Sequence, residues 1–147
     1  MVGAVGFAAW LSGGALDVRF KSEGVIEAAR RAFLSYPATA KGEVIVAEVD
    51  GGIVGWIARE EHPDNISDLW VAPAFQGRGI GSRLLQHLVG SMELEGIATQ
   101  KIDTLASNAP AIGLYQKHGF KIVWQGDEFD AALSISLTKV HLERVCR

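Results

Sequence analysis

The stretch of sequence that decides the fold is residues 69–89, which read Leu-Trp-Val-Ala-Pro-Ala-Phe-Gln-Gly-Arg-Gly-Ile-Gly-Ser-Arg-Leu-Leu-Gln-His-Leu-Val. A short apolar strand is expected to stop at Pro73. A loop with three glycines in five positions, residues 77–81, then opens directly into an amphipathic helix. Glycine lets a backbone approach a ligand closely, and the first turn of a helix presents unpaired N–H groups and the positive end of its dipole. The pattern therefore indicates a phosphate site at the start of this helix.

The size and charge of the chain are those of an ordinary globular protein. Its 147 residues predict one domain, residues 1–147, and 48% of them are hydrophobic and 21% charged. The formal net charge is −3, without a basic run, which argues against nucleic acid as a partner. A cationic or neutral substrate is mildly favoured.

The cysteine content and the hydropathy favour a cytoplasmic protein that does not contact a membrane. The single cysteine, Cys146, cannot form an internal disulfide, as is usual in a reducing cytosol. No segment reaches the roughly 20 apolar residues that a membrane-spanning helix needs. The apolar residues 1–11 lack the basic start of a signal peptide, and residues 3–10 are interpreted as a first strand.

The order of the remaining elements predicts an α+β fold, a mixed sheet with helices on both faces. Helices are expected where apolar residues recur at helical spacing or a capping residue precedes them, and strands where β-branched or alternating residues lie between turns. The expected helices are residues 22–36, 79–95 and 108–119, and the expected strands after the first are residues 43–49, 53–59, 66–71, 101–106, 120–125 and 133–138.

Two familiar phosphate motifs do not fit the glycine loop. A nucleoside-triphosphate loop requires a Lys after its last glycine, and Gly81 is followed by Ser82. A dinucleotide-binding loop requires Gly-x-Gly-x-x-Gly and an acid at the end of the next strand, whereas these glycines are spaced two apart and Asp103 lies near the start of its strand.

A third motif does fit. Gln76-Gly77-Arg78-Gly79-Ile80-Gly81 resembles the Gln/Arg-x-x-Gly-x-Gly/Ala motif of the acetyl-CoA-dependent N-acetyltransferase superfamily, GNAT. Residues 68–73 look like that family's fourth strand, and residues 106–120 look like its strand end, Asn cap, helix and Gly-Phe stop. The resemblance covers about residues 43–139, and residues 1–40 match only loosely. It implies a mostly antiparallel sheet of six to seven strands, splayed between the fourth and fifth.

The resemblance also implies acetyl-CoA as cosubstrate, held largely by main chain. Amides of residues 76–81 would bind the pyrophosphate, and the exposed main chain of Leu69 and Val71 would pair with the pantetheine arm. Arg78 either adds charge or is an ordinary solvated side chain, and Asn108 caps its helix as well as lying near the coenzyme. The implied coenzyme-binding residues are Leu69, Val71, Gln76, Gly77, Arg78, Gly79, Ile80, Gly81, Asn108 and Tyr115.

By the same resemblance, Tyr115 protonates the departing sulfur; the alternative is a buried tyrosine that only packs. Asp68 is the preferred base, with Glu60, Glu61, His62 and Asp103 as rivals. His87 and His118 are interpreted as packing or capping residues. No His/Cys cluster has metal-ligand spacing, so no metal is expected.

The expected activity is transfer of an acetyl group to a primary amine, either a small molecule or a peptide N-terminus. The acids near residues 60–68 and 127–130 are candidates for attracting a cationic amine. One alternative is a non-catalytic acyl-CoA-binding or sensor domain, and a weaker one is an interaction module whose loop binds no coenzyme. Residues 133–140 are expected to be an edge strand through which a homodimer could form.

Overall fold

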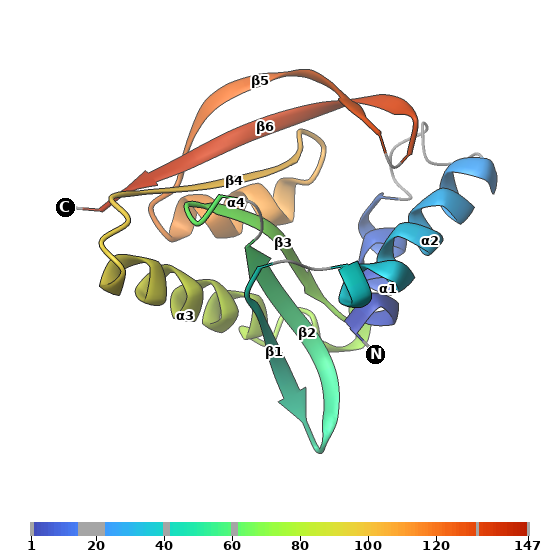
Figure 1. Cartoon of the computed structure of the whole chain (residues 1–147), viewed down its shortest axis with the longest axis horizontal. Helices are drawn as coiled ribbons and strands as arrows, with labels where there is room; N and C mark the ends of the chain where they lie inside the picture. Colours follow the sequence, from blue (N-terminus) through green and yellow to red (C-terminus); the bar gives the residue numbers. More distant parts are fainter. Residues whose placement is uncertain (1, 15–22, 40–41, 60–61, 132, 147) are drawn as a thin grey trace.

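The computed structural model describes residues 2–14, 23–39, 42–59, 62–131 and 133–146. Within these ranges helices flank a central sheet (Figure 1). The elements are α1 (Val2–Gly14), α2 (Glu23–Thr39), β1 (Val44–Val49), β2 (Gly52–Arg59), β3 (Asn65–Val71), the 3-10 turn η2 (Pro73–Phe75), α3 (Ile80–Leu94), β4 (Thr99–Leu105), α4 (Ala109–Lys117), β5 (Lys121–Asp130) and β6 (Ile135–Val145).

The sheet has the strand order β1-β2-β3-β4-β6-β5 and is forked in the middle. All neighbouring strands are antiparallel except β3 and β4, which run parallel and pair only through Asn65 with Lys101 and Ile66 with Ile102. Beyond Ile66 the two strands separate, and Figure 1 shows β1, β2 and β3 diverging from β4, β5 and β6. The expected α+β fold and its splay are confirmed.

A bulge in β3 lies where the fork begins. Arg59 pairs with Ile66 and Ala58 with Asp68, which leaves Ser67 as an extra residue on β3. After the bulge, Ala72 donates its N–H to the Val54 carbonyl on β2 at 2.7 Å. Because backbone groups alternate between the two edges of a strand, the N–H and C=O of Leu69 and Val71 point to the opposite edge, into the fork.

Two apolar clusters lie on opposite faces of the sheet, because successive side chains of a strand alternate between faces. Ile57, Leu69 and Ile102 belong to a cluster with α3 and α4, whereas Trp70 and Leu105 pack with α1 and α2. In Figure 1, α3 and the pair α1 and α2 lie on opposite sides of β2 and β3. The fork therefore lies between two separate apolar clusters, one on each face of the sheet.

The strand expected at residues 3–10 is wrong, because these residues form part of helix α1. The segment is apolar around its whole circumference, so it carries no helical periodicity that the sequence could reveal. Two of its glycines allow close packing. A Cβ at Gly3 would lie 2.2 Å from the Phe33 carbonyl oxygen of α2, and one at Gly6 would lie 2.9 Å from the Trp56 ring. Ser22, the expected cap of α2, lies outside the described residues.

The expected edge strand at residues 133–140 is also wrong. β6 lies inside the sheet, with β4 on one side and β5 on the other. The reason is that β5 extends to Asp130, five residues beyond the predicted end, and occupies that edge along β6. A homodimer through this edge is therefore not available.

The described helices contain no segment that is both long and apolar enough to cross a lipid bilayer.

Candidate functional site

A cavity of about 1030 Å³ occupies the fork between β3 and β4. It reaches both faces of the sheet, because its walls include α3 and α4 on one face and α1 and α2 on the other. Its lining includes ten of the residues expected at a coenzyme or catalytic site: Asp68, Leu69, Val71, Gln76, Gly77, Gly79, Ile80, Gly81, Asn108 and Tyr115.

The glycine loop brings the start of α3 to one end of this cavity. Gly77 and Gly79 have φ values of +77° and +81°, a left-handed conformation that side chains with a Cβ rarely adopt. Gly79 is the N-cap and offers no side-chain hydrogen bond to the helix. The first N–H bonded within the helix is that of Arg83, to the Gly79 carbonyl at 3.1 Å. Amides at the start of α3 are therefore left for an external acceptor.

The open edge of β3 forms the next part of the cavity wall. Leu69 and Val71 line it, and their backbone groups point into the fork. The Gln76 side-chain amide donates to the Val71 carbonyl at 3.0 Å, which joins the glycine loop to the end of the strand. This edge can accept an extended, amide-containing ligand as an additional strand does.

The capping role expected for Asn108 is confirmed. Its Oδ1 accepts a hydrogen bond from the Ala111 N–H at 3.3 Å, and its Nδ2 donates to the Thr104 hydroxyl at 3.4 Å. These contacts join the start of α4 to β4 beside the cavity, and α4 carries Tyr115 at its other end.

Tyr115 presents a buried neutral phenol to the cavity. Only 5% of the residue is exposed, and its ring packs against Phe120 with centroids 6.2 Å apart. Burial, and then the negative charges of Asp103 and Asp68, raise the pKa of the phenol far above its usual value. In the described part of the chain no hydrogen bond to the Tyr115 hydroxyl is present, so its proton can be donated to a ligand.

The carboxylates lie mainly on the α1 and α2 side of the fork. Asp68 accepts a hydrogen bond from the Trp70 indole at 3.1 Å. Asp103 forms an ion pair with Lys139 on β6. All four of these residues line the cavity, and the two acids face it from opposite prongs of the fork.

Some expected residues do not line the cavity. Arg78 lies over the Phe75 ring at 5.1 Å, and His62 and His87 are exposed. His118 packs at the end of α4, where its Nε2 lies 2.9 Å from the Ser82 hydroxyl. Burial, followed by the charges of Lys117 and Arg144, lowers the His118 pKa.

The rival acids Glu60 and Glu61 fall outside the described residues. Within the described ranges, no group of three or more His, Cys, Asp or Glu side chains could hold a metal ion.

The sequence did not reveal the wall that α1 and α2 contribute. Trp10 and Phe33 line the cavity opposite the glycine loop, together with Trp70 of β3. Aromatic residues in an apolar segment look like ordinary core residues, and the interpretation of residues 3–10 as a strand removed the helix that carries Trp10.

The comparison with known families agrees with this geometry. Residues 40–122, more than half of the chain, match the family model described as acetyltransferase (GNAT) domain. The chain therefore belongs to the GNAT family of acetyltransferases.

A curated relative shares part of the sequence. The [ribosomal protein bS18]-alanine N-acetyltransferase of Salmonella typhimurium is 48% identical over 50 residues, which are 34% of this chain and 34% of the relative. The match thus spans about a third of the length of that relative.

Two solved structures share the fold over almost the whole chain. A GCN5-related N-acetyltransferase from Rhodopseudomonas palustris has a TM-score of 0.79 at 21% identity, over 99% of this chain and 88% of that one. The PaiA N-acetyltransferase of Thermoplasma acidophilum, solved in complex with coenzyme A, has a TM-score of 0.74 at 19% identity, over 98% and 90%.

Proposed function

We propose that this chain is an N-acetyltransferase that transfers the acetyl group of acetyl-CoA to a primary amine. The observation that carries the proposal is the combination of the open β3 edge with a helix start whose first amides have no partner within the helix and no side-chain cap among the described residues. Both features lie at one cavity in a forked sheet. A coenzyme with a diphosphate at one end and amides along its arm has the chemistry to match both features.

The coenzyme is proposed to bind through main chain. Amides of residues 76–81 hold the pyrophosphate, and the backbone of Leu69 and Val71 pairs with the pantetheine arm. Asn108 keeps the start of α4 beside that arm. Arg78 contributes only long-range charge, because its guanidinium lies over Phe75 rather than at the cavity.

The proposed reaction is direct attack of the amine nitrogen on the thioester carbonyl carbon. An N–C bond forms and the C–S bond breaks, and the sulfur takes the phenolic proton of Tyr115. After the attack, the nitrogen carries one proton too many, and this proton passes to the phenolate and restores the phenol. Burial disfavours a lasting phenolate, so we expect the two proton movements to be closely coupled.

Asp68 is proposed to take the first proton, the one that an ammonium must lose before its nitrogen can attack. Asp103, which is paired with Lys139, is the alternative. Asp68 is preferred because it lies on β3, the strand that lines the cavity on the side of the glycine loop.

The relatives support the amine class without fixing the acceptor. One is named for acetylating the alanine of a ribosomal protein, so a peptide N-terminus remains one candidate beside a small amine. A cytoplasmic location is part of the proposal, because a chain with a single cysteine and no internal disulfide is typical of the reducing cytosol.

The test has two stages. Calorimetry with acetyl-CoA and with free coenzyme A should give heats of binding, and a thiol reagent should then detect coenzyme A release when amines are added. Binding without release for any amine would favour a non-catalytic acyl-CoA-binding or sensor domain. If neither acetyl-CoA nor free coenzyme A raised the melting temperature, the remaining interpretation would be an interaction module that binds no coenzyme, because a ligand that binds the native state stabilises it.

A further inference from the structure

The strand β5 is the outermost strand of the sheet and leaves one edge open. Its only neighbour among the described strands is β6, and Figure 1 shows it beyond β6 at the rim of the sheet. Among the described residues, the backbone of β5 forms hydrogen bonds with β6 alone. Because backbone groups alternate between the two edges of a strand, the remaining groups face outward. Such an edge can accept a further strand.

Large apolar side chains are exposed along this strand. Ile122, Val123, Trp124 and Phe129 are exposed by 43%, 54%, 44% and 68%. Proteins usually protect an open edge with bulges and charges, and β5 has a bulge at Val123 and charged residues at both ends. The apolar side chains remain exposed beside these devices, which is typical of a surface that binds a partner.

The charges of β5 are divided between its two ends. The strand reads Lys-Ile-Val-Trp-Gln-Gly-Asp-Glu-Phe-Asp over residues 121–130, so its first residue is basic and three of its last four are acidic. An antiparallel copy of the same strand would bring the basic end of each beside the acidic end of the other. Opposite charges on paired strands attract, whereas a parallel copy would place like charges together.

The bulge determines which side chains of β5 share a face. The pairing with β6 skips Val123, so the alternation of side chains shifts by one position there. Ile122 and Phe129 consequently lie on the same face of the sheet, although an odd number of positions separates them. Lys121 and Asp130 share the other face for the same reason. Each end of the strand therefore offers one apolar and one charged side chain, on matching faces.

The middle of β5 allows another strand to approach closely. Gly126 has no side chain, and a Cβ at this position would lie 2.6 Å from the Trp124 ring, which covers the glycine on that face. The same ring meets His141 of β6 edge to face at 5.0 Å, and His141 is paired with Glu128. These contacts hold Trp124 against its own sheet.

We propose that the β5 edge is a dimer interface, occupied by β5 of a second copy of this chain that runs antiparallel about a two-fold axis at Gly126. In this register Ile122 lies opposite the partner's Phe129, and Lys121 lies opposite the partner's Asp130. The two sheets join into one, and the symmetry makes every contact twice. Backbone hydrogen bonds supply affinity, and the apolar and charged pairs select the register.

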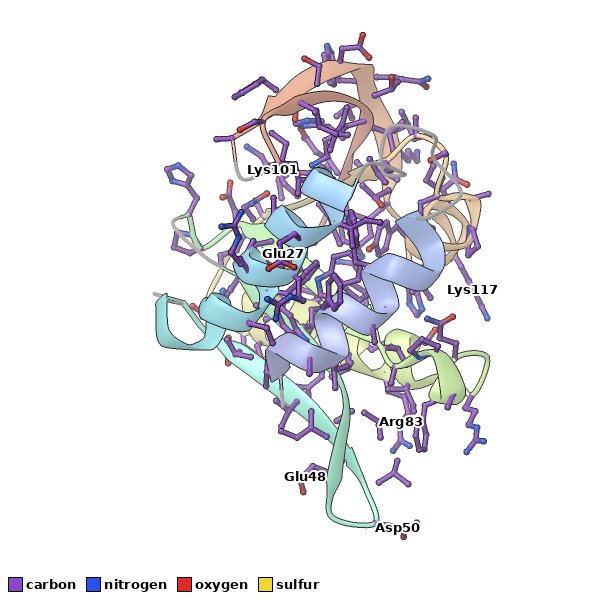
Figure 2. All side chains as sticks on the ribbon, turned by 90° about the vertical axis from the view of Figure 1, so that its right-hand side faces the viewer. Glu27, Glu48, Asp50, Arg83, Lys101 and Lys117 are labelled. Carbon is purple, nitrogen blue, oxygen red and sulfur yellow. The ribbon has the colours of Figure 1, made fainter. Side chains whose placement is uncertain are left out.

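The opposite edge of the sheet is less suited to a dimer. β1 is the other outermost strand, and residues 43–50 contain Glu43, Glu48 and Asp50 but no Lys or Arg. Figure 2 labels Glu48 and Asp50 at the tip of the β1–β2 hairpin. Two antiparallel β1 strands would therefore oppose like charges. Pairing of β1 with β5 would not close and would build open chains of molecules.

Sedimentation equilibrium of the full chain tests the interface without coenzyme or amine. Over a range from about 1 to 100 µM, where interfaces of modest size associate, we expect a reversible dimer and no larger species. The dissociation constant of this dimer is the reference for the variants.

A charge reversal with a rescue tests the register. Lys121→Glu should raise the dissociation constant of the dimer at least about tenfold, since two symmetric attractions become repulsions. Adding Asp130→Lys to this variant reverses both charges of each pair and should restore most of the affinity. Arg83→Glu is the control, because it makes the same charge change on α3, far from β5 in Figure 2. It should leave the dimer unchanged.

A second pair of variants tests the apolar contacts. Phe129→Ala should raise the dissociation constant of the dimer at least about tenfold, because the contact with Ile122 is lost twice. Leu94→Ala is the matched control, since Leu94 is 92% exposed at the end of α3 and does not belong to β5. Both side chains are exposed, so both variants should retain the melting temperature of the monomer.

The contrary outcomes are distinct from a failure of the proposed function. A monomer at every concentration would overturn the interface, and so would species that grow beyond the dimer, the result expected of β1–β5 pairing. A dimer unaffected by Lys121→Glu and Phe129→Ala would place the contact elsewhere and overturn it as well. Absence of rescue by Asp130→Lys would overturn the two-fold register. None of these measurements depends on binding of a coenzyme or on turnover.

Discussion

Replacing Tyr115 by phenylalanine removes one hydroxyl from the centre of the proposed site. If this hydroxyl protonates the leaving sulfur, kcat should fall by about 100-fold or more, the usual contribution of a positioned general acid. The dissociation constant of coenzyme A should stay within about twofold, because the proposed contacts to the coenzyme are made mainly by the glycine loop and the β3 edge. The readout is the rate of thiol release, with calorimetry for the coenzyme.

The same substitution should cost little stability at neutral pH. The ring is buried, but Tyr115 lines the cavity, and its hydroxyl makes no hydrogen bond among the described residues, so its removal breaks no hydrogen bond of the described protein. Ile112→Val, which removes one methyl group from the same helix, is the control and should leave kcat unchanged. A rate equal to that of the wild type for Tyr115→Phe would refute the acid role.

The raised pKa of Tyr115 adds an independent measurement in alkaline solution. Above pH 10 the phenol ionises in the unfolded chain and stays protonated in the folded one, so the unfolded state binds fewer protons and stability falls as pH rises. At pH 11, one pH unit above the ordinary pKa of a tyrosine, the loss of stability through this group is on the order of 1 kcal/mol. Tyr115→Phe should gain that amount relative to the wild type between pH 8 and pH 11 in urea unfolding. Parallel pH profiles would show that the phenol ionises freely in the native state.

Three further predictions concern the loop and the charges. Gly79→Val should weaken coenzyme A binding by more than about 100-fold, since a β-branched residue disfavours the φ of +81° that orients the first amides of α3. The control is Gly113→Ala on α4, where a Cβ would meet open space, and it should leave the calorimetric affinity for coenzyme A unchanged. Equal affinities of the two variants would contradict recognition of the coenzyme by main chain. Asp68→Asn should move the pH dependence of kcat/KM upward, because the amine must then lose its proton unaided, whereas an upward shift confined to Asp103→Asn would transfer the base role to Asp103. Raising the salt concentration from about 50 to 500 mM should raise the KM of a cationic amine several-fold by screening Asp68 and Asp130, and a KM insensitive to salt would exclude electrostatic attraction.

The central part of the fold could be predicted because its constraints are local. The turn at Asp50 and Gly51, with φ values of 51° and 80°, fixes the β1–β2 hairpin, whose tip Figure 2 labels at Glu48 and Asp50. The capping of α4 by Asn108 follows from a side chain and an amide three residues apart. The glycine loop needs positive φ at Gly77 and Gly79, and few sequences can supply it.

The first and last parts of the fold were predicted less well because tertiary packing decides them. The helix α1 is apolar on all sides and is specified by the close approach of Gly3 and Gly6 to Phe33 and Trp56, contacts that no local pattern encodes. The strand β5 continues beyond residue 125, its predicted end, because β6 supplies a hydrogen-bonding partner as far as Asp130.

The two halves of the cavity differ in how they would recognise a ligand, and this difference explains what the sequence could reveal. The coenzyme half is built from backbone whose direction is set by two glycines and by the bulge at Ser67. The glycines that this geometry requires can be recognised in the sequence, and most of the other side chains can be substituted without changing it. The half that faces α1 and α2 is built from side chains such as Trp10 and Phe33, on helices that belong to the least recognisable part of the chain. Substitutions on α1 and α2 should therefore change which amine is bound while leaving coenzyme affinity intact.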